Sequence, residues 1–428
     1  MRLGGRAQAA IEVLAALERE KRPVAQLLAD WGRSHRFAGG GDRAAIGNLV
    51  YDVLRERAST AWTMDSDKPR KLVLGVLMRR WGETPDSLRA AFEGDRHAPD
   101  PPSDEESATF TARDLADAPA HVRADVPEWT AEHLQANFAD EWIAEGAALA
   151  QRPPLDMRVN TLKANGEKVA KALRASPDPS PLARHGLRVP PGAGPSRLPN
   201  VTADQAYQKG WFEVQDEGSQ VVSDLVFAQP GEQVLDLCAG AGGKTLALAA
   251  QMNNRGQVHA YDSDRQRLKP IHERIRRAGA RNVQVHEPDA DLSALVGRMD
   301  RVLVDAPCTG SGTWRRRPDA KWKLTSEQLE ARLQEQDEVL SQAAPFVRPG
   351  GFLCYVTCSV FPEENEARVQ TFLEDNSNFE ALSAGEVWQD LFGFSKPQPW
   401  SSDMKSVTLT PASTGTDGFF FAVLGRTA

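Results

Sequence analysis

Residues 234–245, VLDLCAGAGGKT, constrain the fold of this chain most strongly, because an apolar run breaks into glycines and is followed by the helix-forming run LALAAQM. The apolar run predicts a buried strand that ends near Asp236, and Gly240, Gly242 and Gly243 permit a tight turn. Backbone amides at the start of a helix bind carboxylate or phosphate groups when no bulky side chain covers them. The stretch therefore predicts a loop that holds a small molecule with a polar or anionic tail; a glycine turn without a ligand is the alternative.

Residue spacing distinguishes the ligands that such a loop could bind. A phosphate-binding P-loop has its first glycine where this chain has Cys238, and a dinucleotide fingerprint has its third glycine where this chain has Thr245. Asp262 ends a second predicted strand, QVHAYD, in the position that holds ribose hydroxyls, and Asp289 ends NVQVHEPD, where it could bond an adenine amine. S-adenosylmethionine has a ribose and no pyrophosphate, so it fits this pattern.

Three consecutive domains are predicted from the changing texture of the sequence. Residues 1–150 place apolar residues at helical spacing, for example in DRAAIGNLVYDVLRERA, and predict a small helical bundle. Residues 151–212 are rich in Pro, Gly and Ser and predict a small α+β connecting module. In residues 213–428 short apolar runs alternate with helical runs, which predicts an α/β domain. Its sheet is expected to be mostly parallel and doubly wound, with SVTLTP and GFFFAVLGR as a terminal antiparallel pair.

Composition limits the class of protein further. No apolar run approaches the roughly eighteen residues that span a bilayer, and the first residues alternate apolar with charged side chains too quickly for a signal peptide. We therefore expect a cytoplasmic protein. The four cysteines form no C-x-x-C pair and the eight histidines show no ligand spacing, so we expect reduced thiols and no metal site. Nothing in the sequence indicates an obligate dimer, and a monomer is expected.

The net charge of −8 argues against nucleic-acid binding over the whole surface, because phosphate contacts need clustered Lys and Arg. One local cluster occupies residues 313–323, where cations interleave with Trp314 and Trp322. This mixture suits phosphates and stacked bases. The cluster therefore predicts an RNA-binding patch, with a solvated charged loop as the alternative. The predicted RNA-binding residues are Arg315, Arg316, Arg317, Lys321 and Lys323.

Two cysteines follow predicted strands at the edge where open α/β sheets bind their ligands. RVLVDAP leads into Asp305 and Cys308, and GFLCYVT leads into Cys358. If these strands are neighbours, two thiols and one carboxylate meet beside the cofactor pocket. Cys354, inside its strand, and Cys238, in the glycine loop, are interpreted as packing residues, because a buried cysteine usually behaves as a small apolar side chain.

Two thiols near a methyl donor suggest methylation of carbon 5 of a pyrimidine. Carbon 5 is a poor nucleophile until a thiolate adds to carbon 6 and makes the ring enamine-like. A carboxylic acid at the ring nitrogen would stabilise the adduct, which suits Asp305, and a second thiol would help to remove the carbon-5 proton. Cys358 is interpreted as the nucleophile and Cys308 as the assisting thiol, although spacing alone does not distinguish them.

Taken together, DLCAGAGGKT, DAPCTGSGTWRRRPD and YVTCSVFPEEN resemble, in order and spacing, the Nop/Sun family of RNA cytosine-5 methyltransferases. The resemblance extends upstream through GWFEVQDEGSQ and RVNTLK, and the N-terminal helices resemble the NusB-like RNA-binding bundle of the family's bacterial 16S rRNA member. It implies a Rossmann-like domain that uses S-adenosylmethionine to methylate carbon 5 of a cytosine in RNA, with small-subunit rRNA as the expected substrate. The alternatives are methylation of tRNA or other rRNA, a non-catalytic RNA-binding or ribosome assembly factor, and a P-loop NTPase.

The resemblance also implies roles for individual residues. Cys358 is the nucleophile and Cys308 assists product release. The family loop usually reads Ala-Ala-Pro where this chain has Ala239-Gly240-Ala241. Loss of the proline leaves the unfolded loop more mobile but keeps its amides available, so we expect donor binding to persist. The expected contacts to the methyl donor are Cys238, Ala239, Gly240, Ala241, Gly242, Gly243, Lys244, Asp262, Asp289 and Asp305.

Overall fold

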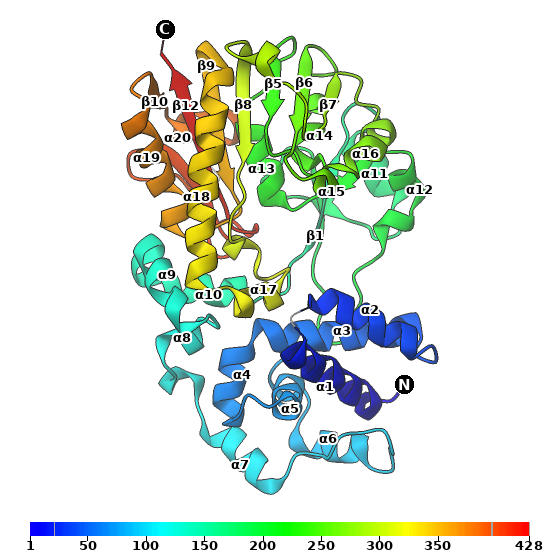
Figure 1. Ribbon diagram of the computed structural model, residues 1–428. Helices are drawn as coiled ribbons and strands as arrows, with labels where there is room; N and C mark the ends of the chain where they lie inside the picture. The colour runs from blue at the N-terminus through cyan, green and yellow to red at the C-terminus, as the bar shows by residue number, and fades with distance from the viewer. Residues whose placement is uncertain (21, 395–396, 428) are drawn as a thin grey trace. The chain divides into compact units, whose positions relative to one another are not determined.

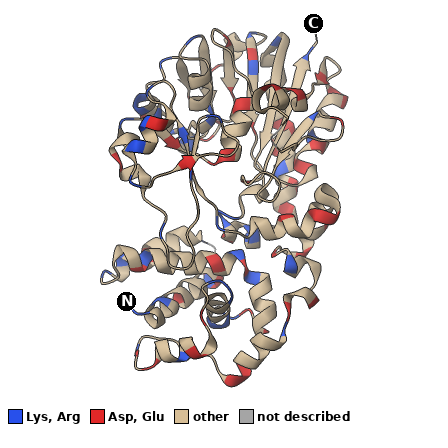
Figure 2. Ribbon diagram, turned by 180° about the vertical axis from the view of Figure 1, so that it is seen from behind, with Lys and Arg blue, Asp and Glu red and all other residues tan. Residues whose placement is uncertain are grey.

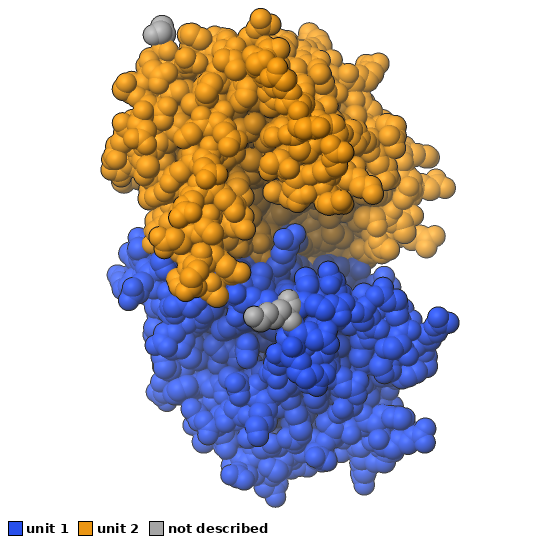
Figure 3. Space-filling view, viewed as in Figure 1, with its two compact units in different colours: residues 1–153, 191–198, 314–324 blue, residues 154–190, 199–313, 325–428 orange. Residues whose placement is uncertain are grey.

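The computed structural model describes residues 1–20, 22–394 and 397–427, and the chain divides into two compact units (Figures 1 and 3). The first, which we call the helical unit, consists of residues 1–153, 191–198 and 314–324. The second, which we call the sheet unit, consists of residues 154–190, 199–313 and 325–428. Each unit is described by itself below. Within the described residues, no helix is both long enough and apolar enough to cross a membrane.

The helical unit packs around an aliphatic core in which Leu49, Val53, Val73 and Leu77 are fully buried. Burial of each such side chain contributes about 1.5–3 kcal/mol to folding. The predicted helical N-terminal region is thus confirmed, whereas its likeness to NusB stays a prediction. Its helices are α1 (Leu3–Arg19), α2 (Val24–Ser34), α3 (Gly40–Arg55), α4 (Arg57–Met64), α5 (Pro69–Arg79), α6 (Pro85–Phe92), α7 (Asp104–Ala112), α8 (Ala120–Arg123), α9 (Ala131–Phe138), α10 (Trp142–Leu149) and α17 (Pro318–Lys323).

Two later stretches of the chain fold into the helical unit. In residues 191–198, the Ser196 carbonyl accepts a hydrogen bond of 2.8 Å from Asn48 Nδ2 on α3. In residues 314–324, the Arg315 carbonyl accepts one of 2.8 Å from Arg55 Nε at the end of the same helix. The consecutive domains 1–150, 151–212 and 213–428 stay a prediction, but the compact helical unit contains residues from all three.

The sheet unit begins with a small antiparallel sheet whose strand order is β2-β3-β1-β4. Met157 on β1 and Phe212 on β4 are fully buried in a small core of its own. This sheet lies in the stretch that the sequence predicts as a small α+β module. Its elements are β1 (Leu155–Val159), α11 (Gly166–Ala172), β2 (Asp178–Pro179), β3 (Gly186–Val189), α12 (Gln205–Gln208) and β4 (Phe212–Val214).

The main sheet has eight strands in the order β10-β12-β9-β8-β5-β6-β7, and β11 pairs with β12. The five strands from β9 to β7 in this order run parallel, while β12 pairs antiparallel with β9, β10 and β11. The predicted parallel sheet with a terminal antiparallel pair is confirmed. The strands are β5 (Gln233–Asp236), β6 (Gln257–Tyr261), β7 (Val283–His286), β8 (Met299–Asp305), β9 (Val347–Thr357), β10 (Phe379–Ala381), β11 (Ser406–Leu409) and β12 (Phe419–Arg426).

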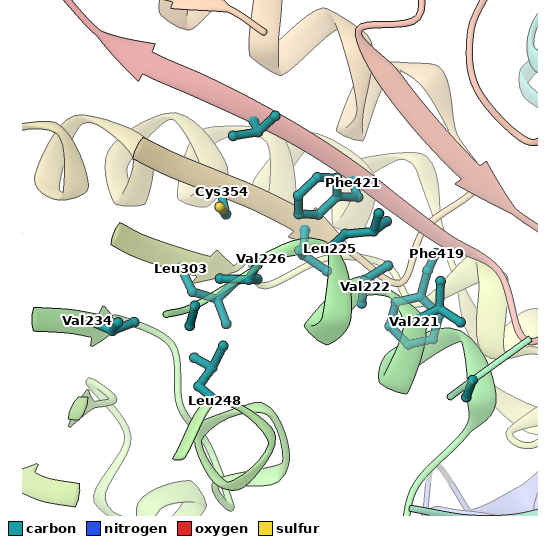
Figure 4. Close-up of a cluster of buried hydrophobic side chains, with 14 of the residues drawn as sticks. Val221, Val222, Leu225, Val226, Val234, Leu248, Leu303, Cys354, Phe419 and Phe421 are labelled. Carbon is teal, nitrogen blue, oxygen red and sulfur yellow. The ribbon is translucent and has the colours of Figure 1, made fainter. Parts of the chain in front are cut away.

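Helices cover both faces of the main sheet because successive strand residues point to opposite faces. On one face Val234, Leu303 and Cys354 pack against α13 and α14 (Figure 4). On the other face their neighbours Leu235 and Val304 pack against α18. Cys354 is fully buried, as expected for a packing residue. The covering helices are α13 (Glu217–Leu225), α14 (Gly243–Gln251), α15 (Arg265–Leu268), α16 (Ile271–Ala278), α18 (Ser326–Ala343), α19 (Glu366–Asp375) and α20 (Ala384–Phe392).

Candidate active site

The glycine loop connects the end of β5 to the start of α14, as the sequence predicts. Gly240 and Gly242 have φ angles of +50° and +81°, a region that side chains disfavour. Gly242 is constrained twice, because a Cβ atom there would lie 2.5 Å from Cγ1 of Ile271. The loop therefore follows a path that its glycines permit.

A cavity with a volume of about 460 Å³ lies over this loop, which is large enough for a small-molecule ligand. Six of the seven loop residues expected to contact a methyl donor line it, Gly242 being the exception, and Asp305 lines it as well. Gln215 Oε1 is buried in the lining and has no hydrogen-bond partner among the described residues. An uncovered glycine loop and an acceptor without a donor fit S-adenosylmethionine, which has amine and hydroxyl donors.

Asp262 follows β6 and lies against the loop. Its Oδ2 accepts a hydrogen bond of 2.9 Å from Gly240 N, and its Oδ1 accepts one of 2.8 Å from Asp264 N. The carboxylate thus supports the loop directly, and its contact with a ribose stays a prediction. Asp289 differs, because its side chain is 83% exposed and faces Arg265 at 3.5 Å. Its contact with an adenine amine also stays a prediction.

Two arginines that the sequence analysis did not single out hold the loop from outside. Arg158 Nη1 donates to the Gly243 carbonyl at 2.8 Å, and Arg274 Nη1 donates to the Ala241 carbonyl at 2.8 Å. Glu213, which is 3% exposed, accepts a hydrogen bond of 3.0 Å from Arg274 Nη2. These contacts fix the loop carbonyls although the loop lacks the family's proline. In the sequence, the sign of these contacts was that Arg158 lies in RVNTLK and Glu213 in GWFEVQDEGSQ, the two upstream segments that share the family resemblance.

Two titratable groups lie at the end of β5 and in the first part of the loop. Asp236 is fully buried, and burial raises its pKa to about 7 despite a hydrogen bond of 2.6 Å from Thr245 Oγ1. Burial, reinforced by the charges of Asp236 and Asp305, raises the pKa of the Cys238 thiol. Cys238 is therefore held as a neutral thiol, which suits a packing residue of the loop better than a nucleophile.

The two thiols at the carboxyl edge of the sheet lie together. Strands β8 and β9 are parallel neighbours, with Asp305 opposite Val356, so the segments that follow them leave the sheet side by side. Cys308 Sγ and Cys358 Sγ are 3.3 Å apart. The hydrogen bond to Cys358 and burial raise the pKa of the Cys308 thiol well above its ordinary value. The two sulfurs thus lie together, as the order of the strands predicts, and the roles assigned to them stay a prediction.

Asp305 joins the thiol site to the glycine loop. Its Oδ2 lies 2.7 Å from Nζ of Lys244, whose ammonium also lies 5.2 Å from the centre of the Phe419 ring. The Lys244 side chain is 8% exposed and that of Asp305 is 33% exposed. One carboxylate is thus in contact with a loop residue, faces the cavity and ends the strand that leads to Cys308.

The predicted RNA-binding cluster is partly buried. Lys321 is 1% exposed, and its Nζ donates to the carbonyls of Arg55 at 2.9 Å and Asp125 at 2.5 Å within the helical unit. Burial lowers its pKa to about 8. Arg315 is 4% exposed. Both cations are buried in this structure, which does not favour a phosphate contact, and their assignment to an RNA-binding patch stays a prediction.

The rest of the cluster also stays a prediction. Arg317 is exposed and Arg316 is partly exposed, whereas Lys323 Nζ donates to the Arg22 carbonyl at 2.7 Å. The tryptophans do not form an exposed stacking surface, because Trp314 is 1% exposed and Trp322 Nε1 donates to the Leu54 carbonyl. Basic and acidic side chains are interspersed along the ribbon in both units (Figure 2).

The mostly parallel sheet, the glycine loop after β5 and the paired thiols after β8 and β9 define a Rossmann-like methyltransferase domain. Two family models agree with this class. A model described as 16S rRNA methyltransferase RsmB/F matches residues 225–425, and a ferredoxin-like domain model of RsmF/B-like methyltransferases matches residues 126–190. The chain belongs to this RsmB/F family.

Curated relatives carry a corresponding name. The chain is 32% identical over 306 residues to the probable ribosomal RNA small subunit methyltransferase B of Synechocystis. It is also 32% identical over 306 residues to the ribosomal RNA small subunit methyltransferase B of Photorhabdus laumondii. Each alignment covers 70% of this chain and 66% of the relative, so the chain spans slightly less than two thirds of these relatives' length.

Solved structures share the fold. The crystal structure of PH0851 matches with a TM-score of 0.74 and 24% identity and covers 100% of both chains. A methyltransferase homolog protein from Pyrococcus horikoshii matches with a TM-score of 0.59 and 27% identity, covering 72% of this chain and 97% of that one. The structure of NSun6 from Pyrococcus horikoshii with SFG has a TM-score of 0.60 at 22% identity and covers 71% and 98%. These matches confirm the predicted fold class.

Proposed function

We propose that this protein uses S-adenosylmethionine to methylate carbon 5 of a cytosine in RNA, and that small-subunit rRNA in the cytoplasm is its substrate. The observation that carries the proposal is the pair of thiols, Cys308 and Cys358, with their sulfurs 3.3 Å apart at the carboxyl edge of the sheet. Asp305 lies on the same edge and lines the cavity over the glycine loop. A nucleophile, a second acid or base and a carboxylate are the groups that this reaction needs.

Binding of the methyl donor is assigned to the glycine loop. When bound, the donor supplies an electrophilic methyl group on a sulfonium. The cavity residues Gln215 and Asp305 offer acceptors to its amine and hydroxyl groups, and Asp262 holds the loop in shape through Gly240 N. Arg158 and Arg274 fix the path of the loop by donating hydrogen bonds to its carbonyls.

The reaction on the base is assigned to the residues that follow β8 and β9. The Cys358 thiolate forms a bond to carbon 6 of cytosine, and the displaced electron pair of the carbon 5–carbon 6 double bond forms the new bond from carbon 5 to the methyl group. The bond between that methyl group and the sulfonium sulfur breaks, its electron pair stays on the sulfur, and a neutral thioether leaves. Asp305, as a carboxylic acid in this step, stabilises the adduct by donating a hydrogen bond to the ring nitrogen. Cys308 then helps to remove the carbon-5 proton, and the electron pair of that C–H bond restores the double bond as the bond from Cys358 Sγ to carbon 6 breaks.

The choice of rRNA is supported by the names of the curated relatives and of the family model. Exposed cations such as Arg317 are available for phosphate contacts. A methyltransferase that acts on tRNA would place the new methyl group in a different RNA. A non-catalytic assembly factor would add no methyl group to any RNA, and the paired thiols would have no catalytic role in it.

The test is a methyl-transfer assay on the purified full-length chain. Labelled S-adenosylmethionine is offered with small-subunit rRNA, large-subunit rRNA or tRNA, and the products are mapped by bisulfite sequencing. We expect label in 5-methylcytosine of small-subunit rRNA. Label only in tRNA or large-subunit rRNA would overturn the choice of substrate, and absence of 5-methylcytosine in every RNA, including rRNA still bound to its proteins, would overturn the reaction itself.

A further inference from the structure

Glu364 is a buried carboxylate beside the two thiols that the reaction above does not use. It ends the short 3-10 helix Pro362–Glu364, six residues after Cys358, and it is 0% exposed. A fully buried carboxylate is rarely found without partners, because the charge loses its hydration. The partners of Glu364 are therefore informative about what the residue does.

The carboxylate binds both chain segments that carry a thiol. On the Cys308 side, Glu364 Oε1 accepts a hydrogen bond of 2.8 Å from Thr309 N, and Oε2 accepts one from Thr309 Oγ1. On the Cys358 side, Oε2 accepts a hydrogen bond from Ser359 Oγ. Thr309 and Ser359 each directly follow a thiol in sequence. Glu364 thus contacts the residue that directly follows each of the two cysteines.

A second layer fixes this arrangement. Gln336 Nε2, on α18, donates to Glu364 Oε1 at 3.0 Å and to the Pro307 carbonyl at 2.9 Å, so it holds the residue before Cys308 as well. The hydroxyls of Ser311 and Ser359 share a hydrogen bond of 2.9 Å, and Gly312 N donates to the Cys358 carbonyl at 3.0 Å. The two segments are therefore joined at several points, with the carboxylate at the centre.

The pattern of donors favours an ionised carboxylate. Four groups donate to its two oxygens, namely Thr309 N, Thr309 Oγ1, Ser359 Oγ and Gln336 Nε2. An ionised carboxylate only accepts hydrogen bonds, so it can satisfy all four, whereas a protonated one would turn one donor away. Burial raises the pKa of Glu364, and these four donors oppose that effect.

The charge of Glu364 acts on one thiol in particular. It contributes to the raised pKa of Cys308, after the larger effects of the hydrogen bond to Cys358 and of burial. A thiol whose pKa is raised keeps its proton in the resting site, so it does not compete with its neighbour as the nucleophile; once it has lost that proton, the same raised pKa makes it the stronger base for the carbon-5 proton. The position of Glu364 therefore favours a division of labour between the two sulfurs.

We propose that Glu364 is a positioning residue of the dithiol site, which fixes the separation and orientation of Cys308 and Cys358 by binding both segments that carry them. Among the described residues, none of its hydrogen bonds goes to a sulfur or to the glycine loop, so it acts through Thr309 and Ser359. The proposal rests on the proposed function for its activity measurement only, because the reactivity of the thiols can be measured without RNA.

The first measurement is the pH dependence of thiol alkylation in the full-length chain. Iodoacetamide is added to the wild type and to Glu364→Gln, Glu364→Asp and Glu232→Gln, and the alkylation of each cysteine is followed by peptide mass spectrometry. Glu232→Gln is the matched control, because Glu232 is a partly buried carboxylate paired with Arg301 elsewhere on the sheet. In Glu364→Gln we expect the alkylation midpoint of Cys308 to fall by about one pH unit, since a nearby negative charge is lost. Glu364→Asp and Glu232→Gln should keep the wild-type midpoint to within a few tenths of a unit.

The second measurement is steady-state methylation. Glu364→Gln should lower kcat by about 10–100-fold, the usual effect of misplaced reacting groups, and leave KM for RNA and donor within about twofold. Glu364→Asp keeps the charge and should restore part of kcat. Should Glu364→Gln fail to fold by circular dichroism, Thr309→Val replaces it, with Thr309→Ser as its control, because only the serine keeps the hydroxyl that reaches Glu364.

The outcomes separate the two proposals. A folded Glu364→Gln variant with a wild-type alkylation midpoint, or one with a shifted midpoint and undiminished kcat, would overturn the positioning role while the proposed function stands. A wild type that methylates no RNA would overturn the proposed function, and the alkylation result would still decide the role of Glu364. A purely structural role predicts equal loss of stability in Glu364→Gln and Glu364→Asp without any change in thiol reactivity.

Discussion

The segments that carry Cys308 and Cys358 and the basic segment 314–324 both look functional in the sequence, yet they fold differently. The thiol segments leave neighbouring parallel strands, and their sulfurs converge at 3.3 Å. In the basic segment, Lys321 donates instead to backbone carbonyls of the helical unit, and Trp314 is buried. Position at a strand end is set by the sheet itself, whereas a cluster of charges does not reveal whether it faces solvent.

The largest effect is expected for Cys358→Ala. Loss of the nucleophile should lower the rate of methyl transfer at least ~1000-fold, because the neighbouring thiol Cys308 has a raised pKa and is assigned to proton removal. Donor affinity measured by calorimetry should stay within about twofold, since the thiol lies outside the glycine loop. Cys354→Ala, which removes a buried core thiol, is the control and should remain active. Retained turnover in Cys358→Ala would assign the nucleophile to another residue.

Lys321→Met should destabilise the helical unit by about 2–4 kcal/mol. The variant keeps a side chain of similar length but leaves the carbonyls of Arg55 and Asp125 without their donor, in a site that is 1% exposed. Urea denaturation followed by circular dichroism measures the change. If the free energy of unfolding stays unchanged while RNA affinity falls, Lys321 is exposed in solution and the contrast drawn above is wrong.

Because of Asp236, the free energy of unfolding should depend on pH below neutrality. Lys321 in the basic segment does not contribute in that range, since its pKa is lowered only to about 8. The pKa of Asp236 is raised from 3.8 to about 7, so the folded protein holds more protons at this carboxyl than the unfolded chain does between those values. Stability should therefore decrease as pH rises from about 4 to 7, by about 4 kcal/mol in all, and level off above 7. Asp236→Asn should remove most of this slope when unfolding is measured across the range. An equal slope in the variant would place the titrating group elsewhere.

Arg317→Ala is expected to have the smallest effect. Arg317 is exposed, so the free energy of unfolding should change by less than about 0.5 kcal/mol. If Arg317 contacts a phosphate, RNA affinity falls severalfold and the salt dependence of binding decreases by about one unit. Filter binding at several salt concentrations measures both. Unchanged RNA affinity would remove the last clearly exposed cation from the predicted RNA-binding cluster.

Much of the site could be predicted because it depends on local sequence. Glycines after an apolar run identify the loop, and Asp305, Cys308 and Cys358 follow strands whose order in a parallel sheet brings their ends together. The contacts that hold these residues could not be predicted in the same way. Arg158 and Gly243, which form a hydrogen bond, are 85 residues apart in sequence, and Thr309 and Glu364 are 55 apart. No spacing rule predicts such pairs.

The fold shows the same limit. Short apolar runs predicted the strands and helical spacing predicted the helices, since these patterns report which residues of an element are buried. They did not predict that residues 191–198 and 314–324 belong to the helical unit. Arg315 and Lys321 were therefore interpreted as RNA-binding residues, because the sequence alone does not show whether a cation is buried or exposed.

The interleaving of the chain has a consequence for how this protein can be cut or recombined. Cleavage at residue 153 would take away the groups that receive Lys321 and Trp322, namely the carbonyls of Arg55, Asp125 and Leu54. The remaining piece would keep residues 314–324, which begin six residues after Cys308, without the partners that bind their side chains. To exchange the helical unit for that of a relative, three separate stretches, residues 1–153, 191–198 and 314–324, would have to be exchanged together.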